Sequence, residues 1–390
     1  MQAGGEHHMV MGNVQPDKEI TRMSPAANSL PSPTRERASE LLAWQPGGGV
    51  LSVYLRIEPG DRSGRWRTEL RNGLAETVRS ESPGEAGDAT DLQRTASRLE
   101  SKLDADPPHA DIRGLIGFVE IAHGPAEERW YASRIPPVRT EVVAGPGPRM
   151  GPLLQMLDDG APLGVAVTSA ERIRLFGWEL GRLEEIHDWE LSYFAGQWRE
   201  RKARTVNPAR GDAVSASGRD RHHQRLEANR GRFNEQAGGL ARNEAAARSW
   251  RRLLVFGDER YAGPFEHGFG PGGCELEHAA DADLVTEPAA GIARRVDELL
   301  PGLNRRRERE LIDRIKEAAY KEGRAALAAQ AVMESLESGR VEHLVCDPEL
   351  PGAERMIGLA LASHAAVTPV EDEAAEALAE HDGAIALLRY

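Results

Sequence analysis

Short apolar runs of strand length alternate with segments of helical periodicity along most of this chain. Leu163–Thr168, Leu253–Gly257 and Val341–Cys346 are such runs, and each is far shorter than the roughly 18 apolar residues of a membrane span. Strands that alternate with helices indicate a mixed α/β (α+β) fold. At roughly 100–200 residues per domain, a chain of 390 residues has room for several domains with buried cores.

The first part of the chain predicts a tail and one α/β domain. Residues 1–35 are rich in Gly, Pro, Ser and Asn without periodicity, which predicts a disordered tail. An N-terminal α/β domain is expected at 36–150, with helical patterns at Trp66–Val78 and Leu92–Leu103. In Ala144–Pro152 glycine and proline alternate as in a linker, so we expect the domain to end there.

The predicted middle domain, 151–275, is an antiparallel-sheet domain with one long arginine-rich helix. Leu163–Thr168, Arg172–Trp178 and Leu183–His187 are separated by short turns, as in consecutive hairpins. The five glycines of Tyr261–Cys274 predict another loop.

The predicted C-terminal domain, 285–390, is a three-layer α/β/α domain. Two helices are expected first, at Ala289–Leu300 and at Arg307–Leu336. Strand patterns at Val341–Cys346 and Ala384–Leu388 then alternate with helical ones, which is the arrangement that places helices on both faces of a sheet.

The charge of the chain is distributed unevenly. The net charge is −13, which argues against general attraction to nucleic acid or to an acidic membrane. Between Arg199 and Arg252, however, fourteen basic residues face six acidic ones, so this stretch carries +8 and the rest of the chain −21. Thirteen of the fourteen are arginine, whose planar fork suits phosphate. The stretch is either a local polyanion site or a solvated helix face laced with ion pairs.

A helical reading of the segment from Arg221 to Arg248 separates its apolar and basic positions. At 100° per residue one apolar stripe forms from Leu226, Phe233, Ala237, Leu240 and Ala247. Arginines fall outside that stripe, so the helix can pack on a sheet while they face outward. We therefore expect RNA binding by Arg219, Arg221, Arg225, Arg232 and Arg242.

The order of these segments resembles a known family. A strand meander, a basic loop that ends in glutamine, a long arginine-rich helix and the strand Leu253–Gly257 are similar to the middle domain of archaeo-eukaryotic-type class-I peptide chain release factors. Gly339–Asp347 and Asp382–Tyr390 are similar to the third domain of bacterial members. The resemblance covers roughly residues 150–390, and before residue 150 only position and α/β character match.

In that family a Gly-Gly-Gln tip enters the peptidyl-transferase centre, where the glutamine N–H stabilises the oxyanion as water attacks the peptidyl-tRNA ester. The matching position here is Gln224, preceded by His222 and His223 instead of glycines. Unlike glycine, His222 and His223 each carry a β-carbon, which makes the strained backbone turn of such a tip energetically costly. The resemblance thus implies a candidate catalytic tip of Gln224, His223 and His222, and the alternative is an incidental loop segment.

Other chemistries find little support in the residues. The only cysteines are Cys274 and Cys346, which excludes a disulfide framework and a four-cysteine zinc site. Zinc binding by His222 and His223 would need a third ligand that no nearby spacing supplies, so no metal and no cofactor is expected. Gly145–Gly151 superficially resembles a dinucleotide loop but reads as a linker. Arg305-Arg306-Arg307 is interpreted as a helix start.

These observations predict a cytoplasmic, ribosome-associated translation factor without a membrane partner. The stop-codon-reading Asn-Ile-Lys-Ser motif of the family is absent, so we expect codon-independent action at the A site. One reading is ribosome rescue by peptidyl-tRNA hydrolysis, and a second is non-catalytic hibernation, as in the related Balon-type factors. A third is an RNA-binding or scaffolding module unrelated to ribosomes. The resemblance also implies that the C-terminal domain docks a translational GTPase.

Overall fold

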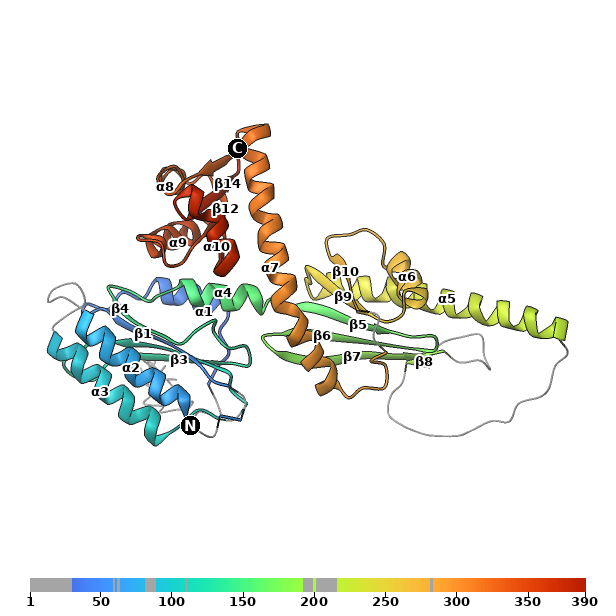
Figure 1. Ribbon diagram of the computed structural model, residues 1–390, viewed down its shortest axis with the longest axis horizontal. Helices are drawn as coiled ribbons and strands as arrows, with labels where there is room; N and C mark the ends of the chain where they lie inside the picture. Colours follow the sequence, from blue (N-terminus) through green and yellow to red (C-terminus); the bar gives the residue numbers. More distant parts are fainter. Residues whose placement is uncertain are drawn as a thin grey trace, which may run out of the picture.

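The computed structural model describes residues 30–58, 60–61, 64–80, 89–109, 111–191, 199–200, 216–280 and 283–390. Three sheets form three domains, and one long helix, α7 (Ala289–Glu322), runs between the middle and C-terminal domains (Figure 1). The predicted mixed α/β fold class is confirmed. None of the helices in the described part of the chain combines the length and apolar character that a bilayer crossing requires.

The N-terminal domain is a four-stranded antiparallel sheet in the order β3-β2-β1-β4. Its central strand β1 buries both faces, because helices cover both. Leu51, Val53 and Leu55 pack under α2 and α3, and Val50 and Tyr54 face α1 and α4. The elements are α1 (Arg35–Leu42), β1 (Val50–Arg56), α2 (Arg65–Ser80), α3 (Ala89–Ala105), β2 (Gly114–Glu120), β3 (Glu128–Ser133), β4 (Glu141–Gly145) and α4 (Gly151–Asp159).

Two predictions for this region need correction. The expected linker Ala144–Pro152 is instead the end of β4 and the start of α4, whose residues Met150, Leu153 and Leu154 are buried. Of the expected tail 1–35, residues 1–29 lie outside the described residues. Within the described remainder, the Pro31 carbonyl accepts a hydrogen bond from the Ala132 N–H at 3.0 Å and Thr34 caps α1, so these residues complete the domain.

The middle domain contains a six-stranded sheet in the order β10-β9-β5-β6-β7-β8. It is antiparallel from β5 to β8, as the hairpin pattern predicts, but β9 and β10 are added in parallel. Helices α5 and α6 make this possible, because parallel neighbours need a crossover connection: α5 precedes β9, and α6 connects β9 to β10. The elements are β5 (Leu163–Thr168), β6 (Arg172–Glu179), β7 (Arg182–Glu190), β8 (Arg199–Glu200), α5 (Ala216–Ala247), β9 (Arg252–Phe256), α6 (Glu259–Phe269) and β10 (Glu275–Ala280).

The predicted loop Tyr261–Cys274 is wrong over most of its length, where the chain forms helix α6. Asp258 caps this helix by accepting a hydrogen bond from the Arg260 N–H at 2.9 Å. Phe265 and Phe269 are fully buried against α5. Gly268 lies so close to α5 that an added Cβ would be 1.9 Å from the Glu235 carbonyl oxygen. The glycine therefore marks a helix contact here, not a turn.

The C-terminal domain has the predicted three layers. Its sheet has the order β11-β14-β12-β13, with α7 and α10 on one face and α8 and α9 on the other. Its remaining elements are β11 (Ala325–Leu327), α8 (Ala329–Glu337), β12 (Val341–Cys346), α9 (Ala353–Ala362), β13 (Ala366–Pro369), α10 (Asp372–Leu378) with a 3-10 turn (Ala379–His381), and β14 (Ala384–Leu388). Cys346 is fully buried on β12, as expected of a strand residue.

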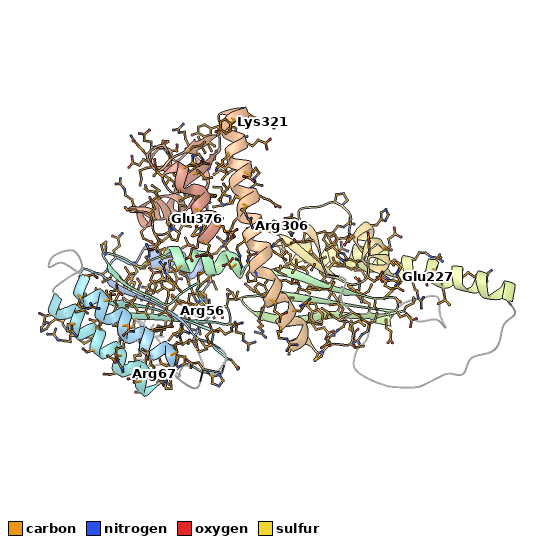
Figure 2. All side chains as sticks on the ribbon, in the orientation of Figure 1. Arg56, Arg67, Glu227, Arg306, Lys321 and Glu376 are labelled. Atoms are coloured by element: carbon orange, nitrogen blue, oxygen red, sulfur yellow. The ribbon has the colours of Figure 1, made fainter. Side chains whose placement is uncertain are left out.

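The two helices predicted before this sheet have different boundaries. Helix α7 continues through Pro301 and Gly302 as one element of 34 residues, and it ends at Gly323, which is left-handed at φ 64°. Its first half packs on the middle sheet through Ile292 and Val296, and its second half on the C-terminal sheet through Leu311 and Ile315. Packing at both ends thus holds the helix across an internal proline. Arg305-Arg306-Arg307 therefore lies in mid-helix and not at a helix start (Figure 2 labels Arg306).

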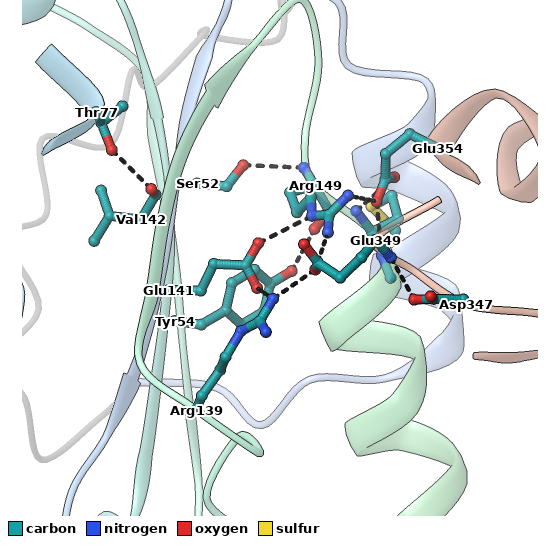
Figure 3. A network of polar contacts seen from close by, with 12 residues as sticks. Ser52, Tyr54, Thr77, Arg139, Glu141, Val142, Arg149, Asp347, Glu349 and Glu354 are labelled. Atoms are coloured by element: carbon teal, nitrogen blue, oxygen red, sulfur yellow. Dashed lines mark hydrogen bonds and ion pairs between the residues drawn. The ribbon is translucent and has the colours of Figure 1, made fainter. Parts of the chain in front are cut away.

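The N-terminal and C-terminal domains share one apolar core. Helix α4 lies between them, and its Leu153 and Met156 belong to the same buried cluster as Tyr54 of β1 and Ile357 of α9. Polar contacts reinforce this junction at the start of α4. Glu354 of α9 accepts hydrogen bonds from the N–H groups of Met150 at 2.8 Å and Gly151 at 3.1 Å (Figure 3). A side chain of one domain therefore caps a helix of the other.

Arg149 connects the same domains through its guanidinium group. Its Nε contacts Glu141 of β4 at 3.1 Å, and its Nη2 contacts Glu349 of the C-terminal domain at 2.6 Å (Figure 3). Its Nη1 contacts Glu354 at 3.4 Å, and the Tyr54 hydroxyl donates to its carbonyl oxygen. The Arg149 side chain is only 15% exposed and that of Glu141 only 12%, so their contact is shielded from solvent, whereas Glu349 is about half exposed.

Candidate nucleic-acid interface

Helix α5 carries most of the predicted site residues and has an inner and an outer part. The inner part packs on the middle sheet through buried positions four residues apart, Phe233, Ala237, Ala241 and Ala245. The outer part, before Arg230, extends beyond the sheet at one end of the molecule, where Figure 2 labels Glu227. At 1.5 Å per residue, the 32 residues of α5 span about 48 Å.

The predicted apolar stripe of this helix is correct only at its centre. Phe233 and Ala237 are buried, and Leu240 packs partly against the core. Ala247 is exposed, and Leu226 is half-buried because it lies beyond the sheet. Ala241 and Ala245 carry the stripe instead, since tertiary contacts with α6, β5 and β6 fix the rotation of the helix.

The β5–β6 turn holds α5 where it leaves the sheet. Arg230 donates to Glu171 of this turn at 2.8 Å, and Asn234 donates through Nδ2 to the Ser169 carbonyl at 3.3 Å. Asn234 is fully buried, so this contact is shielded from water. Among the described residues, the contacts with this turn are therefore the last that hold α5 to the sheet before its outer part begins.

Helices α5 and α6 approach each other through a reciprocal pair of glycines. A Cβ on Gly238 would lie 2.0 Å from the Phe265 carbonyl oxygen, and one on Gly268 would lie 1.9 Å from the Glu235 carbonyl oxygen. Real side chains cannot occupy such space. Gly238 therefore permits close helix packing within a continuous helix, whereas a Cβ on Gly239 would meet only an ordinary contact at 3.7 Å.

Three of the five predicted RNA-binding arginines have described side chains, and all three are exposed: Arg225, Arg232 and Arg242. Among the described residues none of these three forms an ion pair with a carboxylate, and Arg232 contacts only Asn229 and its own helix backbone. Their charges are therefore available to an external anion. The side chains of Arg219 and Arg221 lie outside the described residues, although their backbone belongs to α5.

Other arginines of the basic stretch are used inside the protein. Arg230 contacts Glu227 and Glu171, and Arg248 contacts Glu244 at 3.1 Å. Arg252 is 6% exposed and donates to Asn304 of α7 at 2.8 Å. The basic stretch thus contains both kinds of residue that were expected: exposed arginines that can bind a polyanion, and arginines that form ion pairs or hydrogen bonds within the protein. The ion pairs Glu227–Arg230 and Glu244–Arg248 could be predicted from the sequence, because their partners are three and four residues apart on one helix. No residue near Arg252 indicates that its side chain is buried.

The candidate tip has a helical backbone. His222, His223 and Gln224 lie inside α5, which begins at Ala216 and so earlier than the sequence pattern predicts. Their side chains lie outside the described residues, and so do residues 207–215 of the basic segment that precedes the helix. The catalytic role of Gln224, His223 and His222 stays a prediction. Among the described residues no group of His, Cys, Asp and Glu side chains is placed to hold a metal ion.

Comparison with known proteins agrees with the resemblance for the middle of the chain. Residues 148–300 match the model of "Bacterial archaeo-eukaryotic release factor family 10". This stretch runs from the start of α4 to the middle of α7 and contains the entire middle sheet. The predicted similarity to bacterial release factors of archaeo-eukaryotic type is confirmed there. No curated protein matches the sequence.

Several solved structures align over nearly the whole chain at low similarity. Archaeal translation termination factor aRF1 is 18% identical over 91% of this chain and 96% of its own, with a TM-score of 0.25. Pelota of Archaeoglobus fulgidus is 13% identical over 93% of this chain and 94% of its own, with a TM-score of 0.33. Dom34 of S. cerevisiae, a translation termination-like factor, is 8% identical over 93% of this chain and 97% of its own, with a TM-score of 0.38.

Proposed function

We propose that this protein is a ribosome-associated translation factor of release-factor type that acts codon-independently at the A site. The observation that carries the proposal is that the family match at 148–300 includes the exposed arginine face of α5, formed by Arg225, Arg232 and Arg242. A helix that extends beyond its domain can enter a confined, RNA-lined space, and its free guanidinium groups can contact phosphates there. The acidic remainder of the chain would oppose indiscriminate RNA binding.

Replacing Arg225, Arg232 and Arg242 together with alanine is expected to weaken binding to ribosomes and to flatten its salt dependence. Each lost phosphate contact lowers the slope of log K against log salt by roughly 0.7–0.9, so three contacts account for about 2–3. Co-sedimentation with ribosomes at several salt concentrations measures both quantities.

The matched control is the triple variant Arg65→Ala, Arg295→Ala and Arg355→Ala. These arginines are also exposed, but each already has a carboxylate partner: Glu69, Glu298 and Glu337. The control is expected to bind as the wild type does. An unchanged salt slope in the α5 variant would refute the arginine face, and no co-sedimentation of the wild type at low salt would remove the ribosome proposal.

A non-catalytic role as a hibernation factor is the second candidate, and the backbone at the tip favours it. His222, His223 and Gln224 lie on a regular helix, whose N–H groups bond within the helix and are not free to form an oxyanion hole. Peptide release from ribosomes that carry peptidyl-tRNA distinguishes the two roles. Release by the wild type that Gln224→Ala abolishes supports hydrolysis, and ribosome binding without release supports hibernation.

Docking of a translational GTPase on the C-terminal domain remains a further proposal from the resemblance. It is tested separately, by pull-down of the full chain with a translational GTPase in its GTP-bound form.

A further inference from the structure

The arginine face of α5 also carries side-chain amides. At 100° per residue, one line along the helix has within about 40° of it Arg225, Asn229, Arg232, Gln236 and Asn243. All five side chains are exposed. These five residues form the α5 row, which spans about 27 Å at 1.5 Å per residue. One face of the helix thus combines guanidinium groups with amide groups.

The α5 row lies on the side of the helix that faces away from the sheet. Phe233, Ala237 and Ala241 are buried against the middle sheet, and helical geometry places them on the other side of α5. The row begins in the part of α5 that extends beyond the sheet (Figure 1). In the part of the chain that the structure describes, the row is therefore accessible over its full length.

Acidic side chains are kept off the α5 row. Helical geometry places the carboxylates on the described part of α5 at least about 80° from the line of the row. Each of them has a partner: Glu227 contacts Arg230 at 2.6 Å, Glu235 contacts His267 at 3.0 Å, and Glu244 contacts Arg248 at 3.1 Å. The row therefore offers cations and neutral amides together, which suits a polyanion.

Arg232 orients the amide of Asn229. Its Nη2 donates to Asn229 Oδ1 at 2.9 Å, and its Nε donates to the Ala228 carbonyl at 3.3 Å. Because the amide oxygen is bound to Arg232, the Nδ2 group of Asn229 keeps both of its donors for a ligand. Gln236 and Asn243 make no hydrogen bond with another described residue, so their amides offer donors and an acceptor.

The amides indicate a contact of a different kind from the arginines. Phosphate groups accept hydrogen bonds, and arginine alone supplies the donors and the charge that they need. A ribose 2′-hydroxyl both donates and accepts, as a side-chain amide does. In an RNA double helix the 2′-hydroxyls line a wide, shallow minor groove. The α5 row contains no aromatic side chain on which an unpaired base could stack, so a double helix suits it better than a single strand.

We propose that the α5 row binds double-helical RNA across its minor groove. Arg225 and Arg232 contact the phosphates, and the three amides contact the 2′-hydroxyls. This inference rests on the proposed function and names the form of RNA that α5 contacts. The arginines then account for the salt dependence of binding, and the amides account for a preference of RNA over DNA, which has no 2′-hydroxyl.

Binding of the full chain to an RNA duplex of about 20 base pairs, and to the DNA duplex of the same sequence, tests this assignment. Fluorescence anisotropy at several salt concentrations measures both affinities. The triple variant Asn229→Ala, Gln236→Ala and Asn243→Ala is expected to bind the RNA duplex about tenfold more weakly, because it loses a hydrogen bond at each position. Its salt slope should equal that of the wild type, since no charge is removed, and its preference for RNA should be lost.

The matched control is the triple variant Asn72→Ala, Gln93→Ala and Gln330→Ala, which removes exposed amides from α2, α3 and α8. It is expected to bind as the wild type does, and circular dichroism confirms that each variant is folded. A wild type that binds both duplexes equally well would overturn the inference, and so would an amide variant with wild-type affinity for RNA. Co-sedimentation of the wild type with ribosomes, without binding to the RNA duplex, would overturn this inference alone and leave the proposed function standing.

Discussion

Gly268→Ala is expected to destabilise the middle domain by about 3 kcal/mol or more, because the new Cβ would lie 1.9 Å from the Glu235 carbonyl oxygen. The atom in the way belongs to the backbone of α5, so no side chain can rotate aside. The two helices would have to separate, and Phe265 and Phe269 would lose part of their packing. The melting temperature of the middle domain should fall by roughly 6–12 °C, measured by differential scanning calorimetry.

Gly263→Ala on the same helix is the matched control, since nothing lies within 4 Å of the added Cβ. It should stabilise α6 slightly, by up to about 1 kcal/mol, because alanine is the better helix former. Equal melting temperatures for the two variants would show that α5 and α6 do not approach as closely as described. Because α5 carries the arginine face, Gly268→Ala should also reduce ribosome binding.

Local patterns in the sequence predict the elements whose contacts are local. The hairpins β5–β6–β7 follow from alternating runs with short turns, and the strands β9, β12 and β14 follow from their apolar runs. Helix α6 is missed because its glycines, among them Gly263 and Gly268, predict a loop, while the contact that requires Gly268 is made by another helix. Pro301 likewise suggests a break that packing at both ends of α7 prevents.

The candidate site is predictable from the sequence to the same extent: only features that depend on local contacts can be recognised. The exposure of Arg225, Arg232 and Arg242 follows from helical periodicity, because it depends on one helix alone. The burial of Arg252 depends on Asn304, which is 52 residues away, and no pattern near Arg252 indicates it. The core shared by the N- and C-terminal domains joins Tyr54 to Ile357 through α4, so it too has no local signature. Charge counts identify the basic stretch, and only the fold separates its free arginines from its structural ones.

Arg149→Ala is expected to destabilise the paired N- and C-terminal domains by about 3 kcal/mol. The substitution removes the cation that contacts Glu141 and Glu354, and both carboxylates remain in the junction. Leaving a buried carboxylate without its cation costs more free energy than the intact ion pair contributes to stability. Arg149 lowers the pKa of Glu354, which burial raises, so its loss raises that pKa further. The deficit should therefore shrink as the pH falls and the carboxyl groups take up protons. Urea denaturation of both proteins at pH 5 and pH 8 measures this.

Arg139→Ala provides the comparison, because Arg139 contacts the same Glu349 at 2.6 Å but its side chain is 52% exposed. An exposed pair contributes at most about 1 kcal/mol, so this variant should melt nearly as the wild type does. Since α4 and its cap belong to both domains, Arg149→Ala should lower the stability of the N-terminal and C-terminal sheets together, in one transition. Two separate transitions, with only one of them shifted, would show that the domains fold independently. A single shifted transition would show that the N-terminal and C-terminal domains unfold as one body, as their shared core requires.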